Sequence, residues 1–62
     1  MSQSERNLIH VRILECETRM ADQRQTITRL QSVGGDTASA VHLLSAMESS
    51  QAMRVRRLAA LA

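Results

Sequence analysis

Hydrophobic residues recur at helical spacing on both sides of a glycine pair, Gly34-Gly35. Before the pair, core-type positions are separated by alternating intervals of four and three residues, the heptad pattern of packed helices. These positions are Ile9, Ile13, Cys16, Met20, Gln23, Ile27 and Leu30. After the pair, a broader stripe follows one side of a second segment: Ala40, Val41, Leu44, Met47, Gln51, Val55, Leu58 and Leu61. The pattern predicts two amphipathic helices.

The glycine pair predicts where the first helix ends. Glycine accepts the positive φ that closes many helices, and Asp36 directly after Gly34-Gly35 suits the N-cap of a following helix. We therefore expect helices over about 3–33 and 37–61, joined by a turn at 34–36. So short a connection makes the two helices antiparallel.

The chain start carries a helix-initiation signal, because Ser2 and Glu5 have the spacing of a capping box. The expected unit is a single hairpin over 1–62. Folding about the glycines predicts a register in which facing residues are Leu30 and Ala40 or Val41, Ile27 and Leu44, Gln23 and Met47 or Glu48, Met20 and Gln51, Cys16 and Val55, and Ile13 and Leu58.

Two polar residues, Gln23 and Gln51, occupy core-type positions. A buried amide is costly unless it is hydrogen-bonded, and a polar core residue can fix register in a coiled coil. The sequence leaves two readings open: the amides fix the register, or they reach solvent at the edge of the groove.

The composition favours self-association. The chain has 62 residues and no Phe, Tyr, Trp or Pro, so it lacks large side chains for a compact core. Six apolar residues lie off the main seam: Leu8, Val11, Leu14, Val33, Leu43 and Met53. A second hairpin would cover several of them, which predicts an all-α four-helix bundle built by a homodimer; a tetramer stays open. The expected interface comprises Ile9, Ile13, Cys16, Met20, Gln23, Ile27, Leu30, Leu44, Met47, Gln51, Val55 and Leu58.

Side chains that carry chemistry are sparse. Cys16 is the single cysteine, which excludes an intramolecular disulfide and favours a reducing cytoplasm. His10 and His42 belong to no spaced metal motif, and no pair of carboxylates is placed for acid–base catalysis. The start, MSQSERN, lacks the apolar core of a signal peptide, and no apolar run is long enough to span a membrane. We expect no enzyme, metal, cofactor or membrane partner.

Charge supplies the alternative function. All eight basic residues are arginine, and the net charge is +2. In the expected hairpin, Arg6, Arg12, Arg54, Arg56 and Arg57 approach its open end, where they could contact nucleic-acid phosphates. The alternating residues Arg12, Glu15, Arg19 and Asp22 predict a solvated face of the first helix.

Two resemblances extend this interpretation. The segment from His10 to Ser50 resembles a group of short bacterial proteins without an assigned activity, in which a Q-R-x-x-I-x-x-L segment leads to a G-x-D-T-x-x-A-x-x-L-L turn and helix. The matching residues are Gln23, Arg24, Ile27, Leu30, Gly34, Asp36, Thr37, Ala40, Leu43 and Leu44. This resemblance implies a hairpin fold and no activity.

In length and layout alone, the expected architecture is similar to the Rop family of RNA-binding helical hairpins. No motif is shared, so no binding residue carries over from that family. The sequence thus favours a non-catalytic interaction or regulatory module with an unidentified protein partner, and a Rop-like RNA binder is the alternative.

Overall fold

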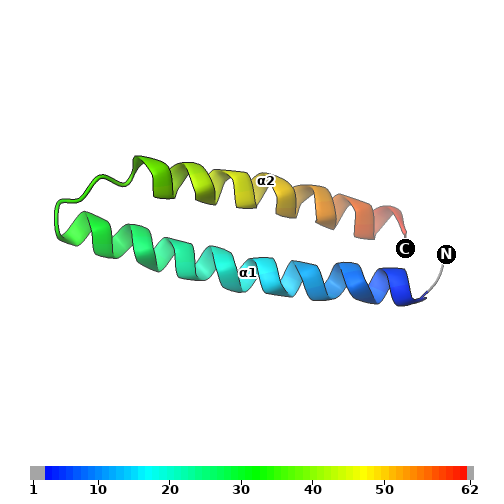
Figure 1. The fold of residues 1–62 in the computed structure, drawn as a ribbon. Coiled ribbons are helices and arrows are strands. Elements are labelled where there is room, and N and C mark those ends of the chain that lie inside the picture. Colours follow the sequence, from blue (N-terminus) through cyan, green and yellow to red (C-terminus); the bar gives the residue numbers. More distant parts are fainter. Residues whose placement is uncertain (1–2, 62) are drawn as a thin grey trace.

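The computed structural model describes residues 3–61, and within this range it is a hairpin of two α-helices without strands. Helix α1 spans Gln3–Ser32 and helix α2 spans Ala38–Ala60. The helices run antiparallel and pack against each other (Figure 1). The predicted all-α hairpin is confirmed. Helix α1 ends one residue before the expected position, and helix α2 begins one residue after it.

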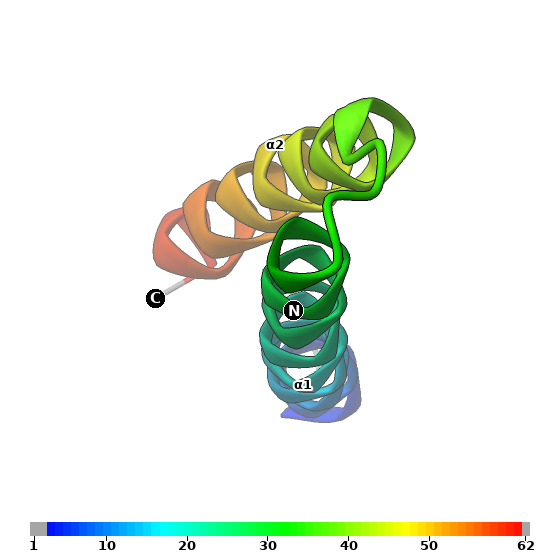
Figure 2. The ribbon, with the colours of Figure 1, turned by 90° about the vertical axis from the view of Figure 1, so that its left-hand side faces the viewer.

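The hairpin is long and thin. Its Cα atoms extend over 49 × 15 × 11 Å, so every residue lies close to the surface. Seen from the turn, α2 crosses α1 at an angle, with its two ends on opposite sides of α1 (Figure 2). Two crossing helices share one contact stripe, and this stripe is the core of the chain.

A Schellman motif ends α1. Gly34 has φ +71°, and its N–H donates to the carbonyl of Gln31 at 3.2 Å, while the N–H of Gly35 donates to the carbonyl of Leu30 at 2.8 Å. These two bonds satisfy carbonyls that the helix leaves without partners. A Cβ at Gly35 would lie 3.3 Å from the Leu30 Cδ2 and carbonyl oxygen. The two glycines therefore serve different needs: Gly34 supplies the backbone conformation, and Gly35 allows a close approach.

The start of α2 corrects the predicted cap by one residue. Thr37 is the N-cap and makes no capping bond through its side chain. The carboxylate of Asp36 still accepts a hydrogen bond from the N–H of Ala38 at 2.9 Å. Asp36 thus satisfies a free donor of the first turn from one position further out. The predicted capping box at the chain start involves Ser2, which lies outside the described residues.

The register between the helices differs from the predicted one by about two helical turns. The amide of Gln23 lies against Ala40 and not against Met47, and Cys16 lies against Met47 and not against Val55. The reason is the connection, which runs back toward the open end before α2 begins (Figure 1). Symmetric folding about the glycines, which the sequence suggested, ignored the length of this segment.

The inward stripe of α1 is the predicted one. Ile9, Ile13, Cys16 and Met20 are buried, while Gln23, Ile27 and Leu30 are half-buried near the turn. No side chain among the described residues is completely buried. The stripe is therefore correct in its position, and it stays in partial contact with solvent along its whole length.

The predicted stripe of α2 is wrong at two positions. Val55 is 50% exposed and Val41 is 44% exposed, so neither belongs to the packed seam. Arg54 is half-buried in place of Val55. Alternation of three and four residues from Gln51 leads to Arg54, and the hydrophobicity of Val55 obscured that spacing. Leu44, Met47 and Leu58 are half-buried, as expected for the seam.

Both seam glutamines form bonds across the hairpin. Gln51 is buried, and its Nε2 donates to the carbonyl of Ile13 at 2.9 Å. The half-buried Gln23 donates in the same way to the carbonyl of Ala40, also at 2.9 Å. These contacts favour the register-fixing reading over the solvent reading. The Oε1 atom of Gln51, however, is buried without a hydrogen-bond partner.

Replacing Gly34 with L-alanine should lower the free energy of unfolding by about 1 kcal/mol, because L-residues avoid positive φ. An added Cβ meets no atom within 4 Å, so the cost is conformational rather than steric. D-Alanine at the same position accepts positive φ and should not destabilise the chain. Thermal unfolding of the two synthetic chains at equal concentration measures the difference, and equal melting temperatures would contradict this account of the turn.

Replacing Gln51 with Met should raise the free energy of unfolding by about 1 kcal/mol, because it removes a buried acceptor that has no partner. The carbonyl of Ile13 lies mid-helix and keeps its helical hydrogen bond. Gln23→Met is the matched control, since that amide is only half-buried, and we expect little change there. Urea denaturation measures both variants. A destabilised Gln51→Met protein would show that the bond to Ile13 outweighs the cost of the orphaned oxygen.

Candidate interaction groove

A groove runs along one flank of the hairpin between α1 and α2. Its central part has a volume of about 400 Å³ and continues toward the open end into a hollow of about 270 Å³. Arg12 and Arg54 line both parts. We call this surface the arginine groove. It is lined by Glu5, Leu8, Ile9, Arg12, Glu15, Cys16, Arg19, Leu43, Ala46, Met47, Ser50, Arg54 and Arg57.

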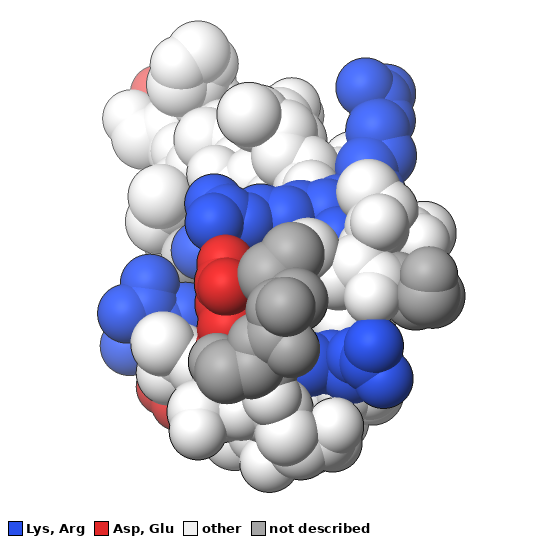
Figure 3. Space-filling view, turned by 90° about the vertical axis from the view of Figure 1, so that its right-hand side faces the viewer, with Lys and Arg blue, Asp and Glu red and all other residues white. Residues whose placement is uncertain are grey.

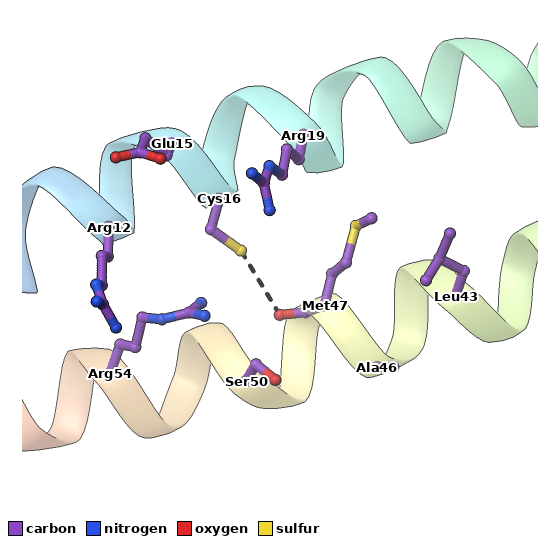
Figure 4. Close-up of a pocket in the computed structure, with 9 residues that line it drawn as sticks. All are labelled: Arg12, Glu15, Cys16, Arg19, Leu43, Ala46, Met47, Ser50 and Arg54. Atoms are coloured by element: carbon purple, nitrogen blue, oxygen red, sulfur yellow. Dashed lines mark hydrogen bonds between the residues drawn. The ribbon is translucent and has the colours of Figure 1, made fainter.

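Three arginines converge on the central part of the groove. Arg12 and Arg19 extend from α1 toward α2, and the guanidinium of Arg54 lies between the helices (Figure 4). None of the three has a hydrogen bond or ion pair with another described residue, and the Nη1 atom of Arg54 is buried without an acceptor. Glu15 lines the same part of the groove. Three cations against one carboxylate give the groove a positive potential that favours an acidic ligand.

Other arginines are already engaged within the hairpin. Arg57 donates to Glu5 at 3.1 Å, and Arg6 donates to the carbonyl of Leu61 at 2.9 Å. Arg24 lies 3.8 Å from Glu48 on the exposed surface. The bonds of Arg57 and Arg6 join the first and last turns of the hairpin at its open end. These two cations therefore stabilise the fold and are less available to a ligand.

The five arginines predicted to contact nucleic acid do not form one patch. Seen from the open end, basic side chains project on several sides of the molecule, with acidic atoms among them (Figure 3). The groove collects Arg12, Arg54 and Arg57, whereas Arg6 bonds to the backbone of Leu61 and Arg56 is exposed outside the lining.

Sequence reasoning assigned no role in binding to several residues of the groove, among them Arg19 and Ser50, and it expected Leu43 only as an apolar residue that a second hairpin could cover. Arg19, Leu43 and Ser50 line its central part, and each lies beside the seam rather than in it. Their signal was their spacing, since positions flanking a heptad seam line the edges of the interhelical groove. That spacing becomes informative only when the register between the two helices is known.

The thiol and the imidazoles do not form a chemical centre. Cys16 is buried, and its Sγ lies 3.9 Å from the carbonyl oxygen of Met47. His10 and His42 are both exposed. Over residues 3–61, no three metal-binding side chains come together. Neither described helix is long and apolar enough to cross a membrane.

Exposed apolar side chains accompany the groove. Leu8 is 52% exposed and Leu43 is 48% exposed, and both belong to its lining. Val11, Leu14 and Met53 are exposed to a similar or greater extent. The groove therefore combines cationic groups with half-exposed leucines, a combination suited to an amphipathic helix that carries carboxylates.

Comparisons with known proteins leave the function open. The chain matches no family model, no curated protein and no solved structure. The resemblance to short bacterial hairpin proteins therefore stays a hypothesis based on the residues of the turn and the seam. Any function assigned to the chain must be argued from the groove and from the exposed apolar residues.

Proposed function

We propose that the protein is a non-catalytic interaction module that acts as a homodimer. In this dimer, the two hairpins together form a four-helix bundle. The observation that carries this proposal is the incomplete core. No described side chain is fully buried, while leucines such as Leu8, Leu14 and Leu43 are about half exposed. A hairpin with so little interior gains stability by sharing an interface with a second copy.

The total surface of the chain supports the same proposal. The hairpin exposes 4673 Å², whereas a compact protein of its mass would expose about 4,000 Å². The excess surface arises because two helices in contact leave most of their circumference in water. Association of two hairpins removes such surface without any change of fold.

The broad face of the hairpin is large enough for a stable contact. It extends over 49 by 15 Å between Cα atoms, and stable interfaces typically bury roughly 800 Å² on each partner. A dimer formed over the groove would bury Leu8 and Leu43, which line it. The proposal therefore requires no segment beyond the described helices.

The non-catalytic part of the proposal is supported by the surroundings of the thiol. The Sγ of Cys16 points to the carbonyl of Met47 (Figure 4) and has no hydrogen bond to a base. A catalytic thiol needs an exposed position and a partner that favours the thiolate. The seam position instead gives Cys16 the role of a small apolar side chain.

Sedimentation equilibrium tests the self-association. We expect a dimer whose helicity, followed by circular dichroism, decreases together with its mass on dilution. Leu8→Gln combined with Leu43→Gln should weaken association by at least roughly tenfold, because each substitution removes apolar area from the interface.

The matched control is Val33→Gln, which changes an apolar residue that is 79% exposed in the connection. This variant should associate like the unchanged protein. A chain that stays monomeric and fully helical at high concentration would contradict the proposed function.

Nucleic-acid binding is the second candidate, and the unpaired guanidinium of Arg54 favours it. Because the groove lacks aromatic side chains for base stacking, we expect structured RNA to stay unshifted in a gel at physiological salt. A shift would favour the RNA reading if Arg12→Gln with Arg54→Gln abolished it and rising salt weakened it. Arg24→Gln with Arg29→Gln is the control that removes the same charge outside the groove.

A further inference from the structure

A ladder of alternating charge follows one flank of α1. Its members are Arg12, Glu15, Arg19 and Asp22, at intervals of three, four and three residues. All four are exposed, and the first three line the arginine groove. None of them makes an ion pair with α2, since the described ion pairs across the hairpin use Arg24 and Arg57. The ladder is thus free to face another molecule.

The order of charges in this ladder is complementary to itself when one copy is reversed. Read from Arg12 to Asp22, the order is positive, negative, positive, negative; read backwards, each sign is inverted. We propose that α1 packs against α1 of a second copy in antiparallel orientation, so that Arg12 faces the partner's Asp22 and Glu15 faces the partner's Arg19. Two-fold symmetry repeats both contacts, which gives four pairs of opposite charge. The inference rests on the proposed self-association and adds its orientation and register.

Alternative arrangements of the same helices are less favourable. A parallel dimer in register sets each charge of the ladder against the same charge of its copy. An antiparallel dimer shifted by one heptad keeps only half of the favourable pairs. One such shift brings Glu5 opposite the partner's Asp22, and the other brings Arg12 opposite the partner's Arg29. Like charges in an interface disfavour these arrangements, so the ladder selects one register.

The arginine groove gains acceptors in this arrangement. In a single hairpin, Arg12, Arg19 and Arg54 share the central part of the groove with one carboxylate, that of Glu15. The partner's Asp22 would lie at Arg12, beside the buried Nη1 of Arg54 that has no acceptor. Carboxylates from a second copy therefore complement the same cations that the hairpin leaves unpaired. The half-exposed Leu8 and Leu43 would border these charge pairs.

Charge reversal on matched chains tests the pairing. One chain carries Arg12→Glu and Arg19→Glu, and the other carries Glu15→Arg and Asp22→Arg, so that each has a ladder of a single sign. Alone, each should self-associate at least roughly tenfold more weakly than the unchanged protein, because like charges then face each other. An equimolar mixture should form a 1:1 heterodimer of native helicity, which sedimentation and circular dichroism measure. Arg24→Glu with Arg56→Glu controls for net charge and should leave self-association unchanged.

A cross-linking experiment tests orientation independently of charge. In a Cys16→Ala background, Leu8→Cys is placed in one chain and Thr26→Cys in another; these exposed positions lie on the same side of α1, about five turns apart. The proposed register sets position 8 against position 26 of the partner. Mild oxidation of the mixture should yield a disulfide-linked heterodimer, and each chain alone should yield little cross-linked product.

The outcomes separate this inference from the proposed function. Efficient linking of the Leu8→Cys chain to itself would show a parallel dimer and overturn the inference. Absence of heterodimer in both experiments would also overturn it, provided that the unchanged protein sediments as a dimer. If the unchanged protein is a monomer, the proposed function fails, and this inference fails with it.

Discussion

The narrow contact between two helices is the constraint on which the rest of the structure depends. A pair of α-helices that touch along one stripe can shield only the side chains on that stripe. The four buried apolar residues all come from α1: Ile9, Ile13, Cys16 and Met20. Helix α2 packs against them mostly with half-buried side chains. Because the chain has no aromatic residues, it has no large side chains that could bury more apolar area along the stripe. Marginal burial is therefore built into the chain, and the exposed leucines follow from it. The same marginal burial is the basis of the proposed association with a second copy.

Polar contacts define the hairpin more strictly than its apolar stripe does. Leucine, isoleucine and methionine would tolerate a slide of one heptad, since apolar packing has little directionality. The amides of Gln51 and Gln23 would not tolerate such a slide, because each donates to a particular carbonyl of the opposite helix. At the open end, Arg6 and Arg57 fix the same alignment through Leu61 and Glu5. Specificity in this small fold is thus obtained from hydrogen bonds whose net contribution to stability is small.

The sequence was sufficient for the elements and insufficient for their alignment. Heptad spacing located the stripe of α1, and the glycine pair located the turn, because both are local properties of the chain. The register depended on how far residues 33–37 run back along the hairpin, which no local pattern encodes. The hydrophobicity of Val55 favours a seam position, but strict spacing favours Arg54, which takes that place and still reaches the groove with its guanidinium. A long arginine can cover apolar surface with its stem, so a seam position does not require an apolar residue.

The misassigned Arg54 also explains why the groove could not be foreseen. Residues that line the groove belong either to the seam of a helix or to the positions beside it. On α2, these positions are defined only when Gln51 and Arg54 are known to point inward and Val55 is known to be exposed. With that correction, Leu43 and Ser50 fall on the same side as Arg12 and Arg19. Cations from both helices then share one groove, although the sequence separates Arg19 and Arg54 by more than half of the chain. The charge ladder can be predicted from the sequence as a helical face, whereas its position beside the groove depends on the register between the helices. In a solvated ladder the charges interact mainly along their own helix. In the proposed antiparallel dimer, each charge would also face an opposite charge of the second copy.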